Sequence, residues 1–467
     1  MIRRYSMTTL AAASLITLAS GCGQSAGDSF GSDRRDPAPT DVAETRQALA
    51  IPSDGQWHWL QGGPSPGIPL MCMDGSWTGF ATNAPTTGGN GKILVWFDGG
   101  GGCYDYTTCN NPQTENPHVT NKSFSQSDFN AGQSSKGDIN ATGLFTWSKA
   151  SLNRGIFDRS PGTTNPFRNY TFVLVPYCTG DSHAGTKHDT TSNIVGRIPS
   201  GSYHVGATNA KLVYSSVLSS LPRPPQVTLA GGSAGGFGAY FIYYALRQMT
   251  PSSIPMTVIS DSGPPLWTGT PGAPPNQNIW QRQGYFLQEQ TQPNDGFVYG
   301  PGQESYTEDL AVDAYGSGPS TGLLPPGVTA YTPFGSRGPI YPTQSVFAKD
   351  LDVQPSTDKF GVIDGSDDWV YSWLIPMNST ASGKLPNILE GLNDLKTNVI
   401  TSHSNARLWI VASTSPPPSS PACTPWPCSN LRPFNQHHGY LLDDVTVWSG
   451  SGVDTFLTSL QWMGITP

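Results

Sequence analysis

The sequence carries little charge, and its charged residues do not gather. Only 12% of the 467 residues are Asp, Glu, Lys or Arg, and the formal net charge is −8 at pH 7. No cluster of Lys and Arg provides the basic field that attracts nucleic acid, so we do not expect a nucleic-acid partner. The chain instead contains 53 Gly and 42 Pro residues, which predict many loops.

The sequence also lacks the spacings typical of a metal centre. It has no Cys-x-x-Cys pair, and none of its seven cysteines stands at zinc-ligand spacing from a histidine. His183, His188 and Asp189 lie close together in sequence, but we expect them to be solvated on a polar loop. We therefore expect neither a metal site nor a cofactor.

The N-terminal apolar run is too short to predict a transmembrane helix, but it resembles an export signal. Arg3 and Arg4 precede this run, and small residues lead to Cys22. The arrangement is typical of a bacterial lipoprotein signal in which Cys22 carries lipid, although Ala19 occupies the place that usually holds Leu. The alternative is an ordinary secretory signal with an incidental cysteine. We predict an exported protein, either a lipoprotein of the cell envelope or a secreted protein.

Three regions follow from composition. Residues 1–22 are the predicted signal, and residues 23–50 form a predicted flexible tether, because they are too poor in apolar residues to build a core. Residues 51–467 are long for one domain but suit a single large α/β domain, which we expect to be a monomer.

Short β-branched or aromatic segments alternate with helix-like segments, which is typical of an α/β fold. Several predicted strands are apolar on both faces, as in a buried parallel sheet. Residues 264–357 predict a large insertion over the carboxyl edge of the sheet, where such folds place their sites. The predicted strands are residues 92–97, 170–175, 227–230, 257–260, 360–363 and 407–412, and the predicted helices are residues 207–221, 236–249 and 453–462.

The pattern Gly-x-Ser-x-Gly occurs at five serines, so the pattern alone identifies no site. Ser25 and Ser29 lie in the predicted tether, while Ser65 and Ser320 lie in predicted loops. Only Ser233 follows a predicted strand and precedes a predicted helix, as a nucleophile elbow requires. The alternative, a phosphate-binding turn, is disfavoured because no Lys follows the glycines. We predict that Ser233 is a nucleophile.

A second glycine-rich segment, from Phe97 to Cys103, follows an earlier predicted strand. A serine that attacks an ester generates an oxyanion, and the amide after the nucleophile, that of Ala234, is one donor to it. The glycines leave backbone amides unobstructed, so this segment is the expected source of the second donor. The alternative is a flexible glycine turn.

In hydrolases of this fold, the acid and the histidine follow the nucleophile in chain order. Asp364, Asp367 and Asp368 come after the strand predicted at residues 360–363, and each is a candidate acid.

Three histidines follow these acids. His403 precedes the last predicted strand and so lies at its wrong end, whereas His437 and His438 follow that strand, where the base belongs. A structural or exposed histidine is the alternative for each.

If Cys22 carries lipid, six cysteines remain, and an exported chain permits disulfides. Six cysteines allow fifteen pairings. Proximity favours the pairs Cys103–Cys109 and Cys423–Cys428, which leaves Cys72 with Cys178.

With these motifs in place, the chain resembles the pectin acetylesterase/Notum family of carbohydrate esterases, which have an α/β-hydrolase fold. The resemblance rests on five pieces in the family's order and covers most of the predicted domain. The pieces are Cys72-Met-Asp-Gly-Ser76, Phe97-Asp-Gly-Gly-Gly-Gly-Cys103 with Cys109, Pro176-Tyr-Cys178-Thr-Gly-Asp181, Gly232-Ser233-Ala-Gly-Gly236 and Ser260-Asp-Ser-Gly263.

The resemblance implies a mostly parallel sheet flanked by helices, with long loop insertions. It implies that Ser233 is the nucleophile and that Gly100, Gly101 and Ala234 form the oxyanion hole. The family also pairs the two cysteines that correspond to Cys72 and Cys178, and it links those that correspond to Cys103 and Cys109.

The resemblance also bears on the acid and the base. Asp367 lines up with the acid of the family's Asp-Ser-Trp sequence, and His438 fits the family's base better than His437. The chain departs from the family at Asp98 and Gly102 and in its C-terminal cysteine pattern, and these differences leave the substrate open.

The resemblance implies an esterase that removes O-acetyl groups from a polysaccharide through an acyl-enzyme. One alternative is a lipase-like deacylase that acts on longer acyl groups. Another is a non-catalytic surface lipoprotein that binds glycan through a degenerate hydrolase fold.

Overall fold

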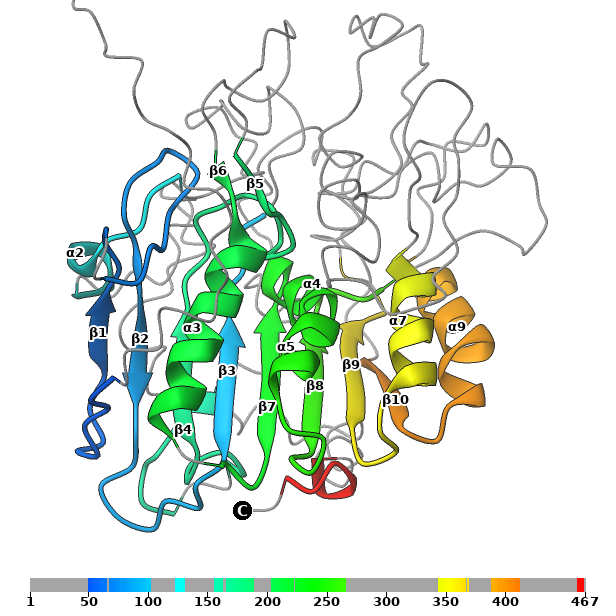
Figure 1. The fold of residues 1–467 in the computed structure, drawn as a ribbon. Coiled ribbons are helices and arrows are strands. Elements are labelled where there is room, and N and C mark those ends of the chain that lie inside the picture. The colour runs from blue at the N-terminus through cyan, green and yellow to red at the C-terminus, as the bar shows by residue number, and fades with distance from the viewer. Residues whose placement is uncertain are drawn as a thin grey trace, which may run out of the picture. The chain divides into compact units, whose positions relative to one another are not determined.

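The fold is described from a computed structural model of the chain (Figure 1). None of the helices in its described residues is long and apolar enough to cross a membrane. The structure describes residues 49–64, 67–101, 122–130, 155–162, 165–188, 203–221, 223–265, 343–366, 368, 388–411 and 460–465.

An eight-stranded sheet forms the centre of the fold, in the order β1-β2-β4-β3-β7-β8-β9-β10. β2 runs antiparallel to both of its neighbours, and every other neighbouring pair is parallel. The strands are β1 (His58–Gln61), β2 (Gly79–Asn83), β3 (Ile93–Phe97), β4 (Thr171–Val175), β7 (Val227–Gly232), β8 (Met256–Asp261), β9 (Lys359–Gly365) and β10 (Ala406–Val411). The order places β3 and β7 side by side, so their carboxyl ends meet.

The sequence of β3 explains why this strand lies inside the sheet. Ile93, Val95 and Phe97 pack into the core on one face, while Leu94 and Trp96 pack into the core on the other. Successive side chains of a strand point to opposite faces, so a strand covered on both faces needs apolar residues at every position. The predicted buried parallel sheet is therefore confirmed.

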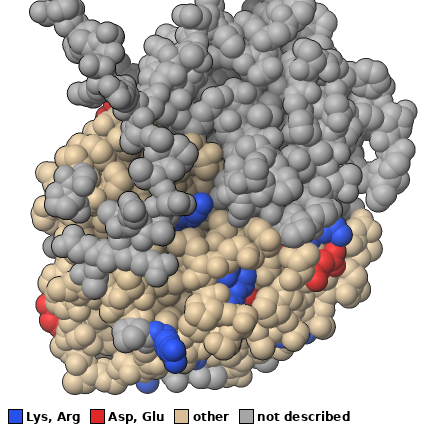
Figure 2. Space-filling view, in the orientation of Figure 1, with Lys and Arg blue, Asp and Glu red and all other residues tan. Residues whose placement is uncertain are grey.

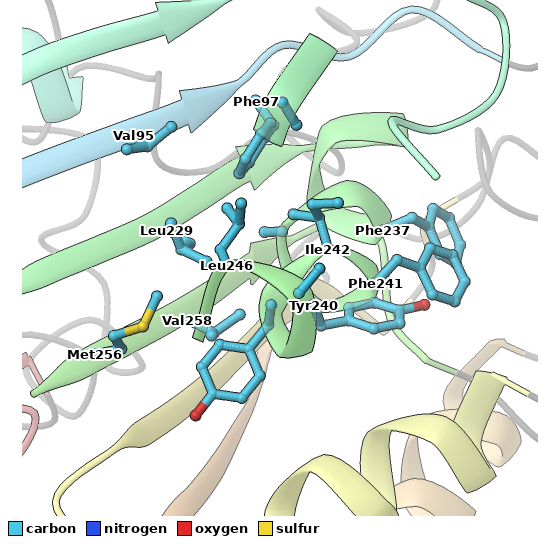
Figure 3. Packing of buried hydrophobic residues seen from close by; sticks show 14 of the residues in the cluster. Val95, Phe97, Leu229, Phe237, Tyr240, Phe241, Ile242, Leu246, Met256 and Val258 are labelled. Carbon is cyan, nitrogen blue, oxygen red and sulfur yellow. The ribbon is translucent and has the colours of Figure 1, made fainter. Parts of the chain in front are cut away.

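Five helices supply side chains to the larger core, on one face of the sheet. Figure 3 shows Phe237, Tyr240 and Leu246 from this layer near strand residues such as Leu229 and Val258. The helices are α3 (Gly206–Ser220), α4 (Ala234–Phe241), α5 (Tyr243–Met249), α7 (Thr343–Val353) and α9 (Ile388–Asn398).

The opposite face is covered by aromatic residues and by the last described segment. Trp57 stacks on Phe172, with ring centroids 6.1 Å apart, and it meets the edge of Phe157 at 5.3 Å. Residues 460–465 add Leu460, Met463 and Ile465 to this second core. The smaller elements are α2 (Gln126–Asn130), η3 (Gly155–Phe157), η6 (Ile400–Ser402) and the two-stranded sheet of β5 (Lys187–His188) and β6 (Tyr203–His204).

All six predicted strands are present, as β3, β4, β7, β8, β9 and β10. The helix predicted over residues 236–249 begins at Ala234 and is divided into α4 and α5 at Ile242. The insertion predicted over residues 264–357 needs correction, because residues 343–353 form α7. β1, β2 and α9 had no prediction. Of the helix predicted at residues 453–462, only its last three residues lie within the described part of the chain.

The described surface is weakly charged. On the face shown in Figure 2, Lys, Arg, Asp and Glu side chains of the described residues are few and scattered. Lys349 and Asp352 form one of the exposed ion pairs, with nitrogen and oxygen 3.0 Å apart. Such a pair contributes little to stability, because water screens both charges.

One ion pair is buried inside the protein. Arg247 of α5 lies 3.2 Å from a carboxylate oxygen of Asp358, and both side chains are almost completely buried. The same carboxylate accepts hydrogen bonds from the hydroxyl of Tyr243 at 2.6 Å and from the amide of Met256 at 2.9 Å. Asp358 therefore ties α5 and the start of β8 to the segment that leads into β9.

We predict that Asp358→Ala lowers the free energy of unfolding by about 3–5 kcal/mol, because it leaves the buried Arg247 charge unpaired. Urea unfolding followed by circular dichroism measures the change. Lys349→Met, which breaks the exposed pair, is the control and should shift stability by less than about 1 kcal/mol. Equal effects of the two variants would show that the buried pair contributes no more to the free energy of unfolding than the exposed pair.

Candidate active site

Ser233 occupies a strained turn between β7 and α4. Its backbone has φ 57° and ψ −123°, a conformation that non-glycine residues rarely adopt. Every other residue from position 226 to position 243 is buried, whereas Ser233 is partly exposed. The strand, turn and helix expected around Ser233 are thus present, and the turn brings this serine toward solvent.

Glycines around this turn permit very close backbone packing. A Cβ atom on Gly235 would lie 1.9 Å from the carbonyl oxygen of Phe97, and one on Gly231 would lie 2.2 Å from that of Gly235. On the other side, a Cβ atom on Gly263 would lie 2.6 Å from the Ser233 carbonyl oxygen. Real Cβ atoms do not approach so closely, so these three positions require glycine.

The glycine-rich segment after β3 lies directly against Ser233. A Cβ atom on Gly99 would lie 3.0 Å from that of Ser233, and Gly101 has φ 78°, which favours glycine. Ala234 is the first residue of α4, where an amide has no carbonyl partner within the helix. The structure therefore brings together the two regions predicted to donate to an oxyanion. Gly102, Cys103 and Cys109 lie outside the described residues.

His183 is buried beneath this segment, which corrects the expectation that it is solvated. Only 1% of the residue is exposed, and its Nε2 lies 2.8 Å from the carbonyl oxygen of Asp98. Its ring packs between Phe97 and Tyr177, with centroids 5.2 and 5.0 Å away. Burial lowers the pKa of His183 to about 4, so the imidazole is neutral at pH 7. The side chains of His188 and Asp189 lie outside the described part of the structure.

Asp181 anchors the loop that carries His183. Its carboxylate accepts hydrogen bonds from the Thr179 hydroxyl at 2.6 Å, the His183 amide at 3.0 Å and the Gly206 amide at 2.6 Å. Burial raises the pKa of Asp181 to about 6, although these three donors favour its charged form. The loop is thereby attached to the start of α3.

The predicted disulfide between Cys72 and Cys178 is present, with Cα atoms 5.0 Å apart. It holds the segment before β2 against the start of the same loop. Cys22, Cys423 and Cys428 lie outside the described residues, so lipidation and the other two predicted disulfides remain predictions.

Two of the three candidate acids are described, at the end of β9. Asp364 and Asp368 are both fully buried. Burial, together with the neighbouring carboxyl groups of Asp368 and Asp261, raises the pKa of Asp364 well above its usual range. This shift favours the protonated form of Asp364. Asp367 lies outside the described residues.

The two candidate bases, His437 and His438, also lie outside the described residues. His403 is described, and its Nε2 lies 3.1 Å from Asp352 of α7. It caps the segment before β10, away from the carboxyl ends of the strands, as expected from its place in the sequence.

The sheet and the serine turn define the class of this protein. A mostly parallel sheet with an antiparallel second strand carries a strained serine between a central strand and the following helix. This is the arrangement of an α/β-hydrolase, so the predicted fold class is confirmed.

Comparison with known proteins shows which α/β-hydrolases this chain resembles. The pectinacetylesterase family model matches residues 68–266. A palmitoleoyl-protein carboxylesterase NOTUM from Schmidtea mediterranea is 25% identical over 171 residues, which are 36% of this chain and 27% of that protein. The match thus spans about a quarter of that relative. The predicted resemblance to the pectin acetylesterase/Notum family is therefore confirmed over residues 68–266.

Two solved structures are also similar. They are two crystal forms of the Wnt deacylase Notum from Drosophila, with TM-scores of 0.45 and 0.43 and sequence identities of 19% and 18%. Each comparison covers 75% of this chain, and 84% and 83% of the respective Notum chains.

The part that matches the family model contains the elbow, the glycine-rich segment and the disulfide, but not the candidate acid and base. Ser233, Gly100, Gly101 and Ala234 fall inside residues 68–266, whereas Asp367 and His438 fall beyond them.

We predict that Gly99→Ala slows the labelling of Ser233 by a fluorophosphonate by at least about 100-fold, because the added methyl displaces the glycine-rich segment from the serine. Its Cβ atom would lie 2.4 Å from the carbonyl oxygen of Gly232. Gly63→Ala is the matched control, because a Cβ atom there meets nothing within 4 Å. Labelling at the wild-type rate in Gly99→Ala would contradict the described contact.

We predict that the stability advantage of the wild type over His183→Gln shrinks at acidic pH. The pKa of His183 is about 4 in the folded protein, where the side chain is buried, and 6.5 in the unfolded chain, where it is exposed. Between these two pH values only the unfolded chain takes up a proton. The stabilisation is therefore complete above pH 6.5 and is lost as the pH falls toward 4, by on the order of 3 kcal/mol. Urea unfolding of both proteins at pH 7 and pH 4.5 measures this change, and a constant difference would rule out a neutral buried His183.

Proposed function

We propose that this protein is a serine carboxylic-ester hydrolase that removes O-acetyl groups from a polysaccharide. The observation that carries the proposal is the strained turn of Ser233, with the glycine-rich segment in contact with it. A partly exposed serine beside two sources of backbone amides is suited to acyl transfer, in which a nucleophile and an oxyanion hole act on one carbonyl.

The mechanism that fits this site is acylation followed by hydrolysis. His438 takes the proton of Ser233 as the serine oxygen attacks the ester carbonyl, and Asp367 orients the imidazole and stabilises its charge. The amides of Ala234, Gly100 and Gly101 stabilise the oxyanion. The protonated His438 then gives its proton to the departing alcohol, and water releases the acyl group by the same steps.

The chemistry of the neighbouring acids supports Asp367 as the orienting residue. An acid that stabilises an imidazolium has to be ionised, and burial together with the neighbouring carboxyl groups raises the pKa of Asp364, which disfavours its ionised form. Asp364 also forms a side-chain hydrogen bond with Asp368, so the carboxyl group of Asp368 already has a partner. These observations disfavour Asp364, and the family resemblance favours Asp367.

Two similarities bear on the acyl group that is removed. The pectinacetylesterase model supports acetyl esters of a polysaccharide. The similarity to a palmitoleoyl-protein carboxylesterase supports the second candidate, removal of a longer acyl group. The net charge of −8 offers no attraction to polygalacturonate, so an uncharged acetylated glycan suits the chain better than pectin itself.

We propose that the enzyme acts outside the cytoplasm as a monomer. The signal-like residues 1–22 and the lipobox-like Cys22 support export and a lipid anchor, and the buried Cys72–Cys178 disulfide suits an oxidising compartment.

We predict that the full-length protein hydrolyses p-nitrophenyl acetate faster than the butyrate and octanoate esters. Ser233→Ala should lower kcat by at least about 10³-fold, since it removes the nucleophile. Ser219→Ala, on the exposed side of α3, is the matched control and should keep full activity. Preference for octanoate would favour the deacylase, and no Ser233-dependent turnover would favour a glycan-binding protein.

We predict that Asp367→Asn and His438→Gln each lower kcat by about 10⁴-fold, because both partners of the proton transfer are needed. His437→Gln and Asp364→Asn should retain most of the activity. Steady-state kinetics on p-nitrophenyl acetate measures all four variants. A larger loss in His437→Gln than in His438→Gln would reassign the base, and the same comparison between Asp364→Asn and Asp367→Asn would reassign the acid.

A further inference from the structure

The first peptide unit of the glycine-rich segment is held at both ends. His183 contacts the carbonyl oxygen of Asp98 at 2.8 Å, and the amide of Gly99 donates to the side chain of Asp98 at 3.1 Å. These two groups belong to the same peptide plane, which joins Asp98 to Gly99. The orientation of this peptide plane sets the direction in which the chain continues to Gly100 and Gly101.

The imidazole that contacts this peptide is itself held from several directions. Ser182 and His183 both have positive φ values, 52° and 58°. The amide of Ser182 donates to the Tyr177 hydroxyl at 2.9 Å, and that of His183 donates to the Asp181 carboxylate at 3.0 Å. Two consecutive non-glycine residues in this region are strained, so the surrounding contacts must maintain them.

His183 also contacts the helix that carries the serine. A Cβ atom on Gly238 of α4 would lie 2.9 Å from that of His183, so helix and loop are in direct contact. Tyr177 packs against the ring, the backbone carbonyl of Asp98 contacts Nε2, and the Asp181 carboxylate accepts from the amide of His183. The imidazole thus connects the start of the glycine-rich segment, through Asp98, with the helix that begins after Ser233.

The hydrogen bond fixes the tautomer. A carbonyl oxygen only accepts hydrogen bonds, so Nε2 of His183 must carry the hydrogen that Asp98 receives. A neutral donor at this place holds the peptide without adding a charge near the oxyanion hole.

We propose that His183 is a positioning residue of the oxyanion hole, which acts by fixing the Asp98–Gly99 peptide and thereby the amides of Gly100 and Gly101. This role rests on the proposed esterase function. Glycines have no side chains to restrain them, so the segment depends on contacts made by its backbone. A displacement of about 1 Å at such a site can cost about 100-fold in rate.

The experiment compares two side chains of similar length in the full-length protein. His183→Gln places an amide nitrogen near the position of Nε2 and keeps a donor, whereas His183→Met has none. Tyr214→Phe is the control, because it removes a buried hydrogen bond of 2.6 Å to Thr250, between α3 and the end of α5. Active-site titration with a fluorophosphonate normalises kcat to the folded fraction, and melting temperatures report stability separately.

We expect His183→Met to lower kcat on p-nitrophenyl acetate by about 10- to 100-fold with little change in KM, because the oxyanion forms only after binding. His183→Gln should recover most of this loss, and Tyr214→Phe should lower the melting temperature without changing kcat. A His183→Met variant that loses stability but keeps the wild-type kcat would overturn the positioning role.

A measurement on the wild type tests the hydrogen bond without a variant. Imidazole ¹⁵N NMR should show His183 as the neutral Nε2–H tautomer throughout pH 5.5–8, and a Nδ1–H tautomer or a titration in this range would overturn the proposal. Absence of Ser233-dependent turnover in the wild type would overturn the esterase function and this role together. Wild-type turnover with an unaffected His183→Met variant would overturn this role alone.

Discussion

The site depends on backbone contacts that only glycine allows. The chain must pass from β7 into α4 within one strained residue, Ser233, while the end of β3 lies against the same turn. Glycines at positions 99, 231 and 235 make this possible, because a methyl group at any of them would overlap with a carbonyl oxygen. The parallel pairing of β3 with β7 brings their carboxyl ends together, so the sheet itself creates the contact. Ser233 and the glycine-rich segment, the proposed nucleophile and oxyanion donors, are thus positioned by the register of β3 and β7.

A second set of contacts, made by the loop after β4, supports the junction between β3, β7 and α4. The loop after β4 is joined to the segment before β2 by the Cys72–Cys178 disulfide and to the start of α3 by Asp181. It presents His183 to the segment after β3. Three neighbouring strands of the sheet therefore contribute their carboxyl ends to one structure: β4 through this loop, β3 through Asp98 and β7 through Ser233. Strain at Ser233 and His183 is maintained because rigid elements surround both residues.

The sequence predicted the parts of the fold in which local pattern and tertiary environment agree. The strands β3, β4 and β7 to β10 were predictable because burial on both faces leaves continuous apolar runs. β1 and β2 were not, since His58–Gln61 and Gly79–Asn83 contain polar or small residues; β1 is the edge strand of the sheet and β2 lies next to it. His183 was misread because its polar neighbours suggested solvent, and its burial arises from the tight turn at Ser182 and the fold around it. The sequence signal available was its place in the Tyr-Cys segment that follows the strand predicted at residues 170–175.

Two buried titratable groups near Ser233, Asp364 and His183, have pKa values shifted toward their neutral forms. An oxyanion that forms beside Ser233 is destabilised by any nearby negative charge in a medium of low dielectric constant. The amide of Ser233 donates to the carbonyl oxygen of Asp261, and Asp261 in turn is one of the groups that raise the pKa of Asp364. Burial raises the pKa of Asp364 and lowers that of His183 to about 4, so burial favours the neutral form of each residue. In the proposed mechanism, the charge separation of acyl transfer is carried instead by Asp367 and His438.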